Sequence, residues 1–371
     1  MVSSSKQSAE DMEEKNIKGM EKARLMAIHR AQFPENPIRS ISEEYYAWKV
    51  YNNPVMAGDI HLEMRDGRTA GSAVVMPRKV ANMDDIVLAA ETADTFTVSE
   101  YRGQGINTKI LGNAIDWAIS HGMHLVYGPP NKANYGTHIR LGYKTCEYIN
   151  WASLTKSLNP LWLASKLTAK IILGKQVQKS FRHLRHLSKG LTTRRHSSHP
   201  GQNSRKNDFT IMQIDRFTNE VDPLWGKTRY SFFIYRDKEY LNWRYFDNPD
   251  KFIVLAAFKG QDCLGYSALK LSNDKRTGIL CDFVTMNDRS DIFLALIRES
   301  ERILKHNGAE HIQLRCITDS PYYHDLMALG YYNPGPESHH PVFINARTET
   351  GKRILENPGR WHFTYGDTDE V

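Results

Sequence analysis

The apolar and polar positions of this 371-residue chain change period several times, and the changes predict a mixed α/β fold. The stretch RDGRTAGSAVVM predicts a β-hairpin that turns at Asp66 and Gly67, and the next apolar run predicts a strand ending near Val98. A stripe at helical spacing then predicts a helix that stops at Gly122, followed by a strand at MHLVYG and a close at RLGYKTCEYINW. The order is hairpin, strand, helix, strand.

The second half of the chain repeats this order. It contains FKGQDCLGYSALKL for the hairpin, GILCDFVTM for the strand, DIFLALIRESERILKHNG for the helix, HIQLRCI for the next strand and ALGYYNPG for the close. The helix stops Gly122 and Gly308 are 186 residues apart, and the LGY glycines Gly142 and Gly330 are 188 apart. We therefore expect two copies of one mixed α/β unit.

The net charge of +7 is concentrated in one segment between the two copies. Residues 156–206 hold 12 of the 49 basic residues and no acid, which leaves 37 basic residues against 42 acids elsewhere. Asn159 and Pro160 predict the start of a helix that stops at Gly174, and a second short helix carries the apolar positions Val177, Phe181, Leu184 and Leu187. Two interpretations of residues 159–187 stay open: an inter-domain brace, or a basic face that contacts a membrane or an acidic partner.

Composition indicates a globular protein with a sizeable core, because 40% of the residues are apolar and 11% are aromatic. Residues 1–18 are polar and lack the apolar region of a secretory signal, so we expect a disordered tail and a cytoplasmic protein. No apolar run reaches the ~20 residues that a spanning helix needs. The cysteines show no CxxC pair and indicate neither a disulfide framework nor a metal site: Cys146, Cys263, Cys281 and Cys316.

The most informative stretch is TFTVSEYRGQGINTKILGNAIDWAISHG, residues 95–122, in which a glycine turn joins a strand to a helix. The amides at a helix N-terminus have no intrahelical acceptor, and the helix dipole adds positive charge, so such a turn can bind an anion. Gly103 and Gly105 allow the backbone to approach a phosphate closely, and Arg102 adds a guanidinium. The turn lacks the GxGxxG and GxxxxGK[ST] patterns, which disfavours dinucleotides and nucleoside triphosphates.

Taken together, TVSEYRGQGINTKIL, the strand HLVYG, the PN dipeptide and LGY resemble the GNAT superfamily of acyl-CoA-dependent N-acyltransferases over residues 20–155. The resemblance implies that acetyl-CoA, or another acyl-CoA, lies with its pyrophosphate on Arg102, Gly103, Gln104, Gly105, Ile106 and Asn107. It also implies that the pantetheine arm pairs with the main chain of Phe96, Thr97 and Val98, near Asn131. No metal is implied.

Two asparagines of this region bear on the resemblance. Asn107 stands where the family pattern usually has Gly or Ala, which predicts a tighter or altered phosphate cradle. Asn131 matches an asparagine that the family often uses near the CoA chain, but Asn beside Pro is also common in turns, and both roles stay open.

The reaction implied by the resemblance is direct attack of an amine on the thioester, which needs a proton acceptor and an acid for the departing thiolate. Glu91 and Asp94 are candidate bases, and we prefer Asp94; the two point to opposite faces unless a bulge intervenes. The candidate acid is His138, where the family commonly has Tyr, with Tyr135 one turn earlier. A structural role for His138 stays open.

The second copy has TMNDRSDIF where the first has the glycine turn, so acids stand where a pyrophosphate needs donors. We therefore expect a degenerate copy that binds no CoA. The stretches DKEYLNWRYFDNP and RWHFTYGDTDE mix aromatic and charged residues, which suits a sugar or peptide acceptor, although ordinary packing also explains them. The candidate acceptor residues are Trp243, Arg244, Trp361, Asp367 and Asp369.

These observations predict a tail (1–18), a GNAT-like acyl-CoA-binding domain (19–155), a basic helical linker (156–206) and a degenerate GNAT-like domain (207–371). The resulting hypothesis is an N-acyltransferase, acting on an amino sugar in polysaccharide biosynthesis or on a related small amine, in the cytoplasm or at the inner membrane face. Alternatives are a Fem-like aminoacyl-tRNA-dependent transferase and a non-catalytic tandem binding module. The intact RGQG turn argues against the tRNA-dependent alternative, so no nucleic acid partner is expected.

Overall fold

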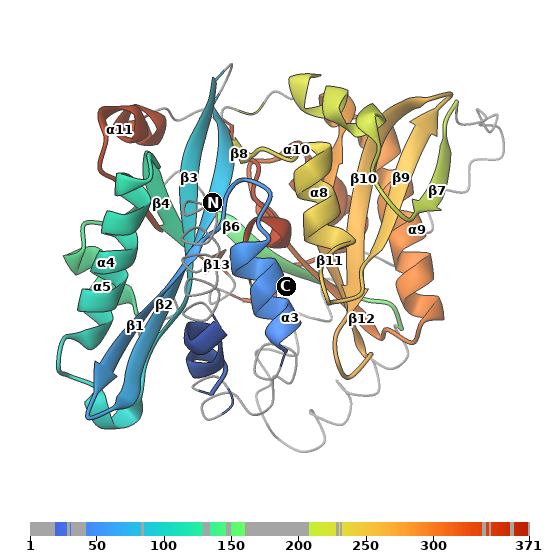
Figure 1. Ribbon diagram of the computed structural model, residues 1–371. Helices are drawn as coiled ribbons and strands as arrows, with labels where there is room; N and C mark the ends of the chain where they lie inside the picture. The colour runs from blue at the N-terminus through green and yellow to red at the C-terminus, as the bar shows by residue number, and fades with distance from the viewer. Residues whose placement is uncertain are drawn as a thin grey trace, which may run out of the picture. The chain divides into compact units, whose positions relative to one another are not determined.

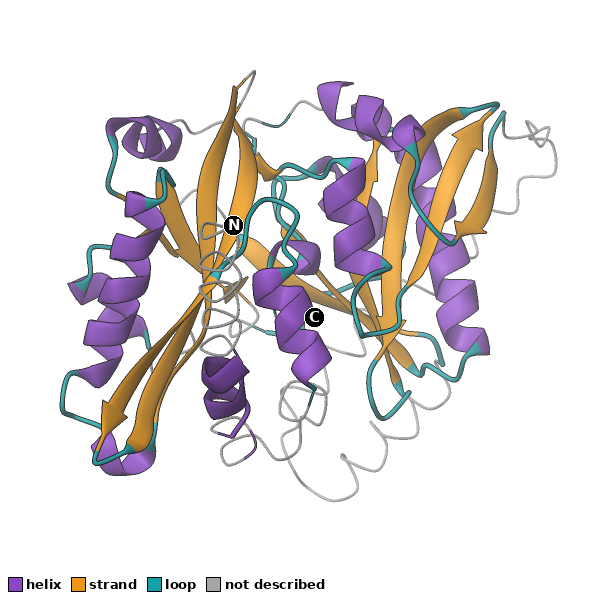
Figure 2. Cartoon of the chain, in the orientation of Figure 1, coloured by secondary structure: helices purple, strands orange, loops and turns teal. Residues whose placement is uncertain are grey.

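The computed structural model consists of two compact units, each built on a mixed β-sheet with helices packed on it (Figures 1 and 2). The first unit comprises residues 1–146, 239–250 and 342–358, and the second comprises the remainder of the chain. The structure describes residues 19–27, 30, 42–82, 85–128, 134–145, 150–159, 208–227, 230, 232–335, 339–340, 343–356 and 360–369.

The sheet of the first unit has the strand order β1-β2-β3-β4-β14-β5. Its strands are β1 (Asp59–Arg65), β2 (Arg68–Asn82), β3 (Asp85–Thr97), β4 (Leu125–Gly128), β5 (Lys144–Thr145) and β14 (Phe343–Ala346). Its helical elements are α3 (Glu43–Tyr46), η1 (Ala47–Tyr51), η2 (Ser99–Tyr101), α4 (Ile106–Ser120), α5 (Tyr135–Arg140), almost all of α8 (Lys238–Tyr245), and α11 (Glu349–Glu356). Strand β4 runs parallel to β3, because α4 carries the chain back along the sheet.

Local sequence determines the main elements of this unit. The β1–β2 hairpin turns at Asp66 (φ +49°) and Gly67 (φ +74°), the left-handed conformations that a two-residue hairpin turn favours. Helix α4 ends at Ser120, and Gly122 (φ +81°) follows it as the predicted stop. The apolar stripe of α4 packs on the sheet, and its buried members are Ile106, Ile110, Leu111, Ala114, Ile115 and Ala118.

The sheet of the second unit has the strand order β13-β6-β12-β11-β10-β9-β7. The strands of the unit are β6 (Trp151–Ser157), β7 (Thr210–Ile214), β8 (Phe233–Ile234), β9 (Ile253–Lys259), β10 (Asp262–Leu271), β11 (Thr277–Thr285), β12 (His311–Ile317) and β13 (His339–His340). Its helical elements are η3 (Asn219–Lys227), η4 (Met286–Asp288), α9 (Ser290–His306), α10 (Pro321–Ala328) and η6 (Tyr365–Asp367). The hairpin, strand, helix and strand recur as predicted, so the mixed tandem fold is confirmed.

The units are not the two contiguous ranges that the sequence suggested. Strand β6 begins within the predicted first domain (19–155) but pairs with β12 of the second sheet. Strand β14 lies within the predicted second domain (207–371) but pairs with β4 and β5 of the first sheet. The local pattern identifies a strand but not its partner, because strand pairing joins residues that are distant in sequence.

Several predictions lie outside the described residues, namely the tail 1–18, most of the basic linker and Cys146. The linker helices therefore stay predictions. The other three cysteines are buried free thiols, at Cys263, Cys281 and Cys316. No helix in the described part of the chain combines the length and apolarity needed to cross a membrane.

Candidate functional site

The glycine turn (residues 99–105) leads from the end of β3 into the N-terminus of α4. Gly103 and Gly105 have φ of +81° and +74°, and a Cβ at either position would meet no atom within 4 Å. The glycines are therefore required by backbone conformation, and the space around them is open. Gly105 is the N-cap of α4 and provides no side-chain cap, so the first amides of the helix point toward this open space.

Asn107 does not fill that space. Its side-chain amide donates to Oδ1 of Asn134 at 2.9 Å and to Oγ1 of Thr137 at 3.3 Å, which ties the first turn of α4 to α5. The departure from Gly or Ala therefore builds a helix-to-helix contact. Sequence analysis missed Asn134, whose only signal was its place in the asparagine-rich stretch after β4; the predicted Asn131 lies outside the described residues.

Strands β3 and β4 pair only over Ala89–Glu91 and Leu125–Tyr127. Beyond this ladder β3 continues along β2 to Thr97, and within the described ranges no strand pairs with its other edge. The carbonyls of Thr95 and Thr97 instead accept from side chains, the Asn134 amide at 3.1 Å and Nε of Arg102 at 3.3 Å. We call this edge, residues 92–97, the strand gap of the first unit.

Asp94 lies in the strand gap on a β-bulge. The register of β3 on β2 shifts between Ala93 and Phe96, and Asp94 has a φ of +47°. Its Oδ2 accepts from Nζ of Lys49, on η1, at 2.6 Å, and the two side chains are only 5% and 2% exposed. Oγ of Ser72 donates to the Asp94 carbonyl at 3.0 Å and holds the bulge.

Glu91 is fully buried, and its Oε2 accepts from the Arg78 guanidinium at 2.7 Å. Arg78 also lies over the ring of Trp243, which in turn stacks on Trp48, the residue before Lys49. Glu91 and Asp94 therefore point to the same face of the sheet, opposite α4. The bulge causes this, because the extra residue reverses the alternation that would otherwise separate positions 91 and 94.

Trp243 and Arg244, predicted to bind the acceptor, are instead packing residues of the first unit. Trp243 is 4% exposed and its ring lies 4.8 Å from that of Trp48. Each indole donates to the main-chain carbonyl of the other residue, at 2.7 and 3.0 Å. Arg244 is 3% exposed and lies over the Trp48 ring. A stretch that mixes aromatic and charged residues is typical of buried packing as well as of an acceptor site, so the composition did not distinguish the two.

Trp361 and Asp367 are likewise buried, within the second unit. The Trp361 ring stacks on Phe232 at 3.7 Å, and the residue is 3% exposed. The Asp367 carboxylate accepts from the Arg236 guanidinium at 2.5 Å, and both side chains are fully buried. Asp369 is partly buried beside them. These contacts explain the residues by packing rather than by acceptor binding.

His138 is 4% exposed, and its Nδ1 lies 3.0 Å from the carbonyl of Asn134. Burial lowers the pKa of His138, so the imidazole is neutral near pH 7 and its Nδ1–H donates to that carbonyl. A neutral imidazole whose N–H is already hydrogen-bonded to a helix carbonyl is a poor acid. The bond to Asn134 instead stabilises the first turn of α5. Tyr135, one turn earlier, is 47% exposed.

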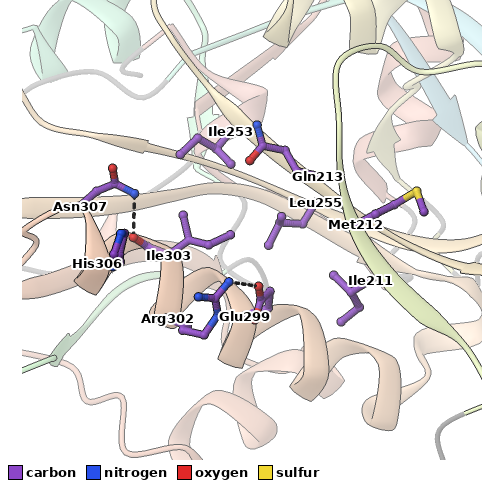
Figure 3. Close-up of a pocket in the computed structure, with 10 residues that line it drawn as sticks. All are labelled: Ile211, Met212, Gln213, Ile253, Leu255, Glu299, Arg302, Ile303, His306 and Asn307. Atoms are coloured by element: carbon purple, nitrogen blue, oxygen red, sulfur yellow. Dashed lines mark hydrogen bonds and ion pairs between the residues drawn. The ribbon is translucent and has the colours of Figure 1, made fainter.

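A separate hollow of about 510 Å³ lies in the second unit between β7, β9 and α9 (Figure 3). Both apolar and polar side chains line it, and Glu299 and Arg302 are paired at 2.6 Å on α9. It contains none of the residues that the sequence singled out. Among the described residues no cluster of three or more His, Cys, Asp or Glu side chains could hold a metal ion.

Comparison with known proteins gives a family match for part of the sequence and several structures with a similar fold. Residues 23–143 match the acetyltransferase (GNAT) family, and none of the curated proteins matches the sequence. The structure is similar to a GCN5-related N-acetyltransferase from Anabaena variabilis (TM-score 0.54, 10% identity, 91% of this chain and 72% of that one). It is also similar to N-myristoyltransferase from Saccharomyces cerevisiae with bound myristoyl-CoA (0.53, 10%, 82% and 74%).

A third similar structure is a tandem GNAT protein from the clavulanic acid biosynthesis pathway, with a TM-score of 0.50, 12% identity, and 79% of this chain and 84% of that chain covered. At such identities the likeness concerns the fold. The matched range of the sequence contains the glycine turn, the strand gap and both carboxylates. The likeness to the acetyltransferase (GNAT) family is therefore a match of residues 23–143, the part of the chain that holds these features.

Proposed function

We propose that the protein is an acyl-CoA-dependent N-acyltransferase whose first unit binds the acyl-CoA and carries out the transfer. The observation that carries this proposal is the adjacency of the strand gap and the glycine turn at one end of β3, inside the range that matches the GNAT family. A strand edge that pairs with no strand of the described ranges can offer main-chain groups to an extended arm, and a helix N-terminus without a side-chain cap can offer amides to a pyrophosphate.

The residues present fit such a ligand. The space at Gly103 and Gly105 is open to a phosphate, and Arg102 is exposed beside it. The bond from Arg102 to the Thr97 carbonyl is long, at 3.3 Å, so the guanidinium can leave it for a phosphate oxygen at little cost. The same movement would release the carbonyl to the pantetheine arm.

The proposed chemistry is direct transfer. The amine nitrogen attacks the thioester carbonyl, the carbon–sulfur bond breaks, and a proton leaves the nitrogen. We assign this proton to Asp94, at the strand gap, rather than to Glu91, which has no exposed surface and is bound to Arg78 within the sheet. Because His138 is engaged with a helix carbonyl, the departing thiolate would take its proton from water or from the exposed Tyr135.

The acceptor and the cellular place belong to the same proposal. We propose a small amine, such as an amino sugar of a surface polysaccharide, as the acceptor, on the grounds that the chain outside residues 156–206 is mildly acidic and attracts cations. Contact of residues 159–187 with the inner membrane face is a further proposal, resting on their basic amphipathic pattern.

The first test is calorimetry with acetyl-CoA. We expect the native chain to bind it and Arg102→Ala to bind roughly 10- to 100-fold more weakly, because a charge-assisted contact to phosphate contributes about 1.5–3 kcal/mol. Arg68→Ala is the matched control, since Arg68 is an exposed arginine of the same unit at the start of β2. Thiol release with candidate amines then measures turnover. Failure of the native chain to bind any acyl-CoA would refute the proposal.

A further inference from the structure

The second unit contains a copy of the strand gap. Strands β11 and β12 run parallel over Thr277–Leu280 and His311–Leu314, and this ladder then ends as the β3–β4 ladder does. The two ladders start at equivalent residues, because Ala89 and Thr277 differ by 188 and Leu125 and His311 by 186, the offsets found between the glycines of the two copies.

The equivalence continues past the β-bulges, which fall between Ser72 and Val74 on β2 and between Ala268 and Leu269 on β10. Strand β10 follows β2 with an offset of 194, so that the pair Gly71–Thr97 in the first sheet corresponds to Gly265–Thr285 in the second. Both glycines allow a close approach, since a Cβ would lie 2.8 Å from the Phe96 carbonyl at Gly71 and 2.7 Å from the Val284 carbonyl at Gly265. Positions 283 and 285 of β11 therefore correspond to positions 95 and 97 of β3.

The chain itself occupies the main-chain groups of the second gap. The Thr285 amide donates to the hydroxyl of Tyr322, on α10, at 2.9 Å. The main chain of Phe283 bonds to the buried imidazole of His362. In the first unit the carbonyls at the corresponding positions, Thr95 and Thr97, accept from Asn134 at the start of α5 and from the exposed Arg102 on the glycine turn.

His362 belongs to a C-terminal segment, residues 360–369, that is anchored to β11 and to Arg236 by hydrogen bonds. Asp282, equivalent to Asp94 by the offset of 188, accepts from Arg236 at 2.9 Å and from the Thr364 hydroxyl at 2.9 Å. The other end of the Arg236 guanidinium binds Asp367. Every residue from 361 to 368 is buried, so the segment is part of the interior of the unit.

The Tyr365 ring of the segment lies beside both β11 and β12. The Tyr365 ring packs on Cys281 of β11 and lies 4.5 Å from the guanidinium of Arg315 on β12. The turn before α9 also lacks a phosphate cradle, because residues 286–289 form a short turn and Asp291 stands in the first turn of the helix.

We propose that residues 360–369 are a built-in occupant of the second strand gap, filling the place that acyl-CoA takes in the first unit, so that each chain binds one acyl-CoA. The comparison of the two gaps rests on the function proposed above for the first unit. The filling of the second gap rests only on contacts within the second unit.

Hydrogen exchange measured by mass spectrometry on the full chain tests the filling without acyl-CoA. Asp367→Asn weakens the anchor, and we expect it to raise the exchange rates of 361–368 and of β11 residues 281–285 together, by tenfold or more, while α9 is unchanged. Asp208→Asn, the same chemical change at an exposed carboxylate of the same unit, is the control and should alter neither segment. Acceleration of the segment without β11 would overturn the proposal.

Calorimetry with acetyl-CoA tests the consequence. We expect a stoichiometry of one per native chain, loss of that site in Arg102→Glu, and an unchanged stoichiometry in Asp208→Asn. A stoichiometry of two, or one site that survives Arg102→Glu, would overturn the proposal. Absence of binding to the native chain would refute the function proposed for the first unit, and the exchange experiment would then decide the filling of the second gap by itself.

Discussion

The ion pair between Lys49 and Asp94 allows catalysis to be separated from stability. Its side chains are 2% and 5% exposed and its atoms are 2.6 Å apart, so Asp94→Asn leaves a buried ammonium without its carboxylate. Removing one partner of a buried pair costs about 3–5 kcal/mol in unfolding free energy. Asparagine is the suitable replacement, because it tolerates the φ of +47° at this position, whereas Ala would add strain of about 1–2 kcal/mol.

The double variant Lys49→Met/Asp94→Asn removes both charges and should recover about 2–3 kcal/mol of the summed single losses. Turnover should not recover with it. If Asp94 is the base, both variants lose roughly 10²- to 10⁴-fold in kcat. Denaturant unfolding and thiol release measure the two quantities on the same samples.

Lys109→Met provides a matched control. Nζ of Lys109 lies 2.7 Å from Oε2 of Glu63, close to the distance in the Lys49–Asp94 pair, but the Lys109 side chain is 56% exposed. Its removal should cost at most about 1 kcal/mol, because the Lys109 ammonium is largely exposed and Glu63, 10% exposed, keeps its ion pair with Arg65 at 3.0 Å. An Asp94→Asn loss equal to that of the control would refute the burial argument, and an Asp94→Asn enzyme with native turnover would refute the assignment of the base.

Three further outcomes are expected. Gly105→Ala forces a Cβ into a left-handed N-cap and should lower unfolding free energy by about 1–2 kcal/mol and weaken acetyl-CoA binding, measured by denaturation and calorimetry. Trp243→Ala removes the stack on Trp48 and should cost about 3–5 kcal/mol of stability with an unchanged KM for the amine; a raised KM in a stably folded variant would restore the acceptor role. Burial raises the pKa of Asp367 to about 6 and lowers that of His362 to about 3, so from pH 4 to 6 the carboxyl makes stability fall with pH and the imidazole makes it rise. Relative to the native chain, the melting temperature of His362→Gln should therefore fall as the pH rises from 4 to 6, and a relative rise would contradict the lowered pKa of His362.

Local sequence was sufficient for the features that short-range physics determines. The hairpin at Asp66 and Gly67 and the glycine turn follow from residues that tolerate a positive φ. The extent of α4 follows from its apolar period and from the stop at Gly122. The constant offset between the copies predicted the recurrence of strand, helix and strand, because the same period selects the same element twice.

Only the tertiary structure decided what surrounds each residue. Whether Trp243 meets an acceptor or Trp48 depends on a partner 195 positions away, and the same holds for Asp367 and Arg236, 131 apart. The bulge at Asp94 arises from a register shift against β2, which turns Glu91 and Asp94 to one face, and alternation alone predicted opposite faces. The sequence by itself thus determined the elements and the turn, since these depend on neighbouring residues, whereas strand partners, burial and the filling of the second gap depend on contacts that the local pattern does not encode.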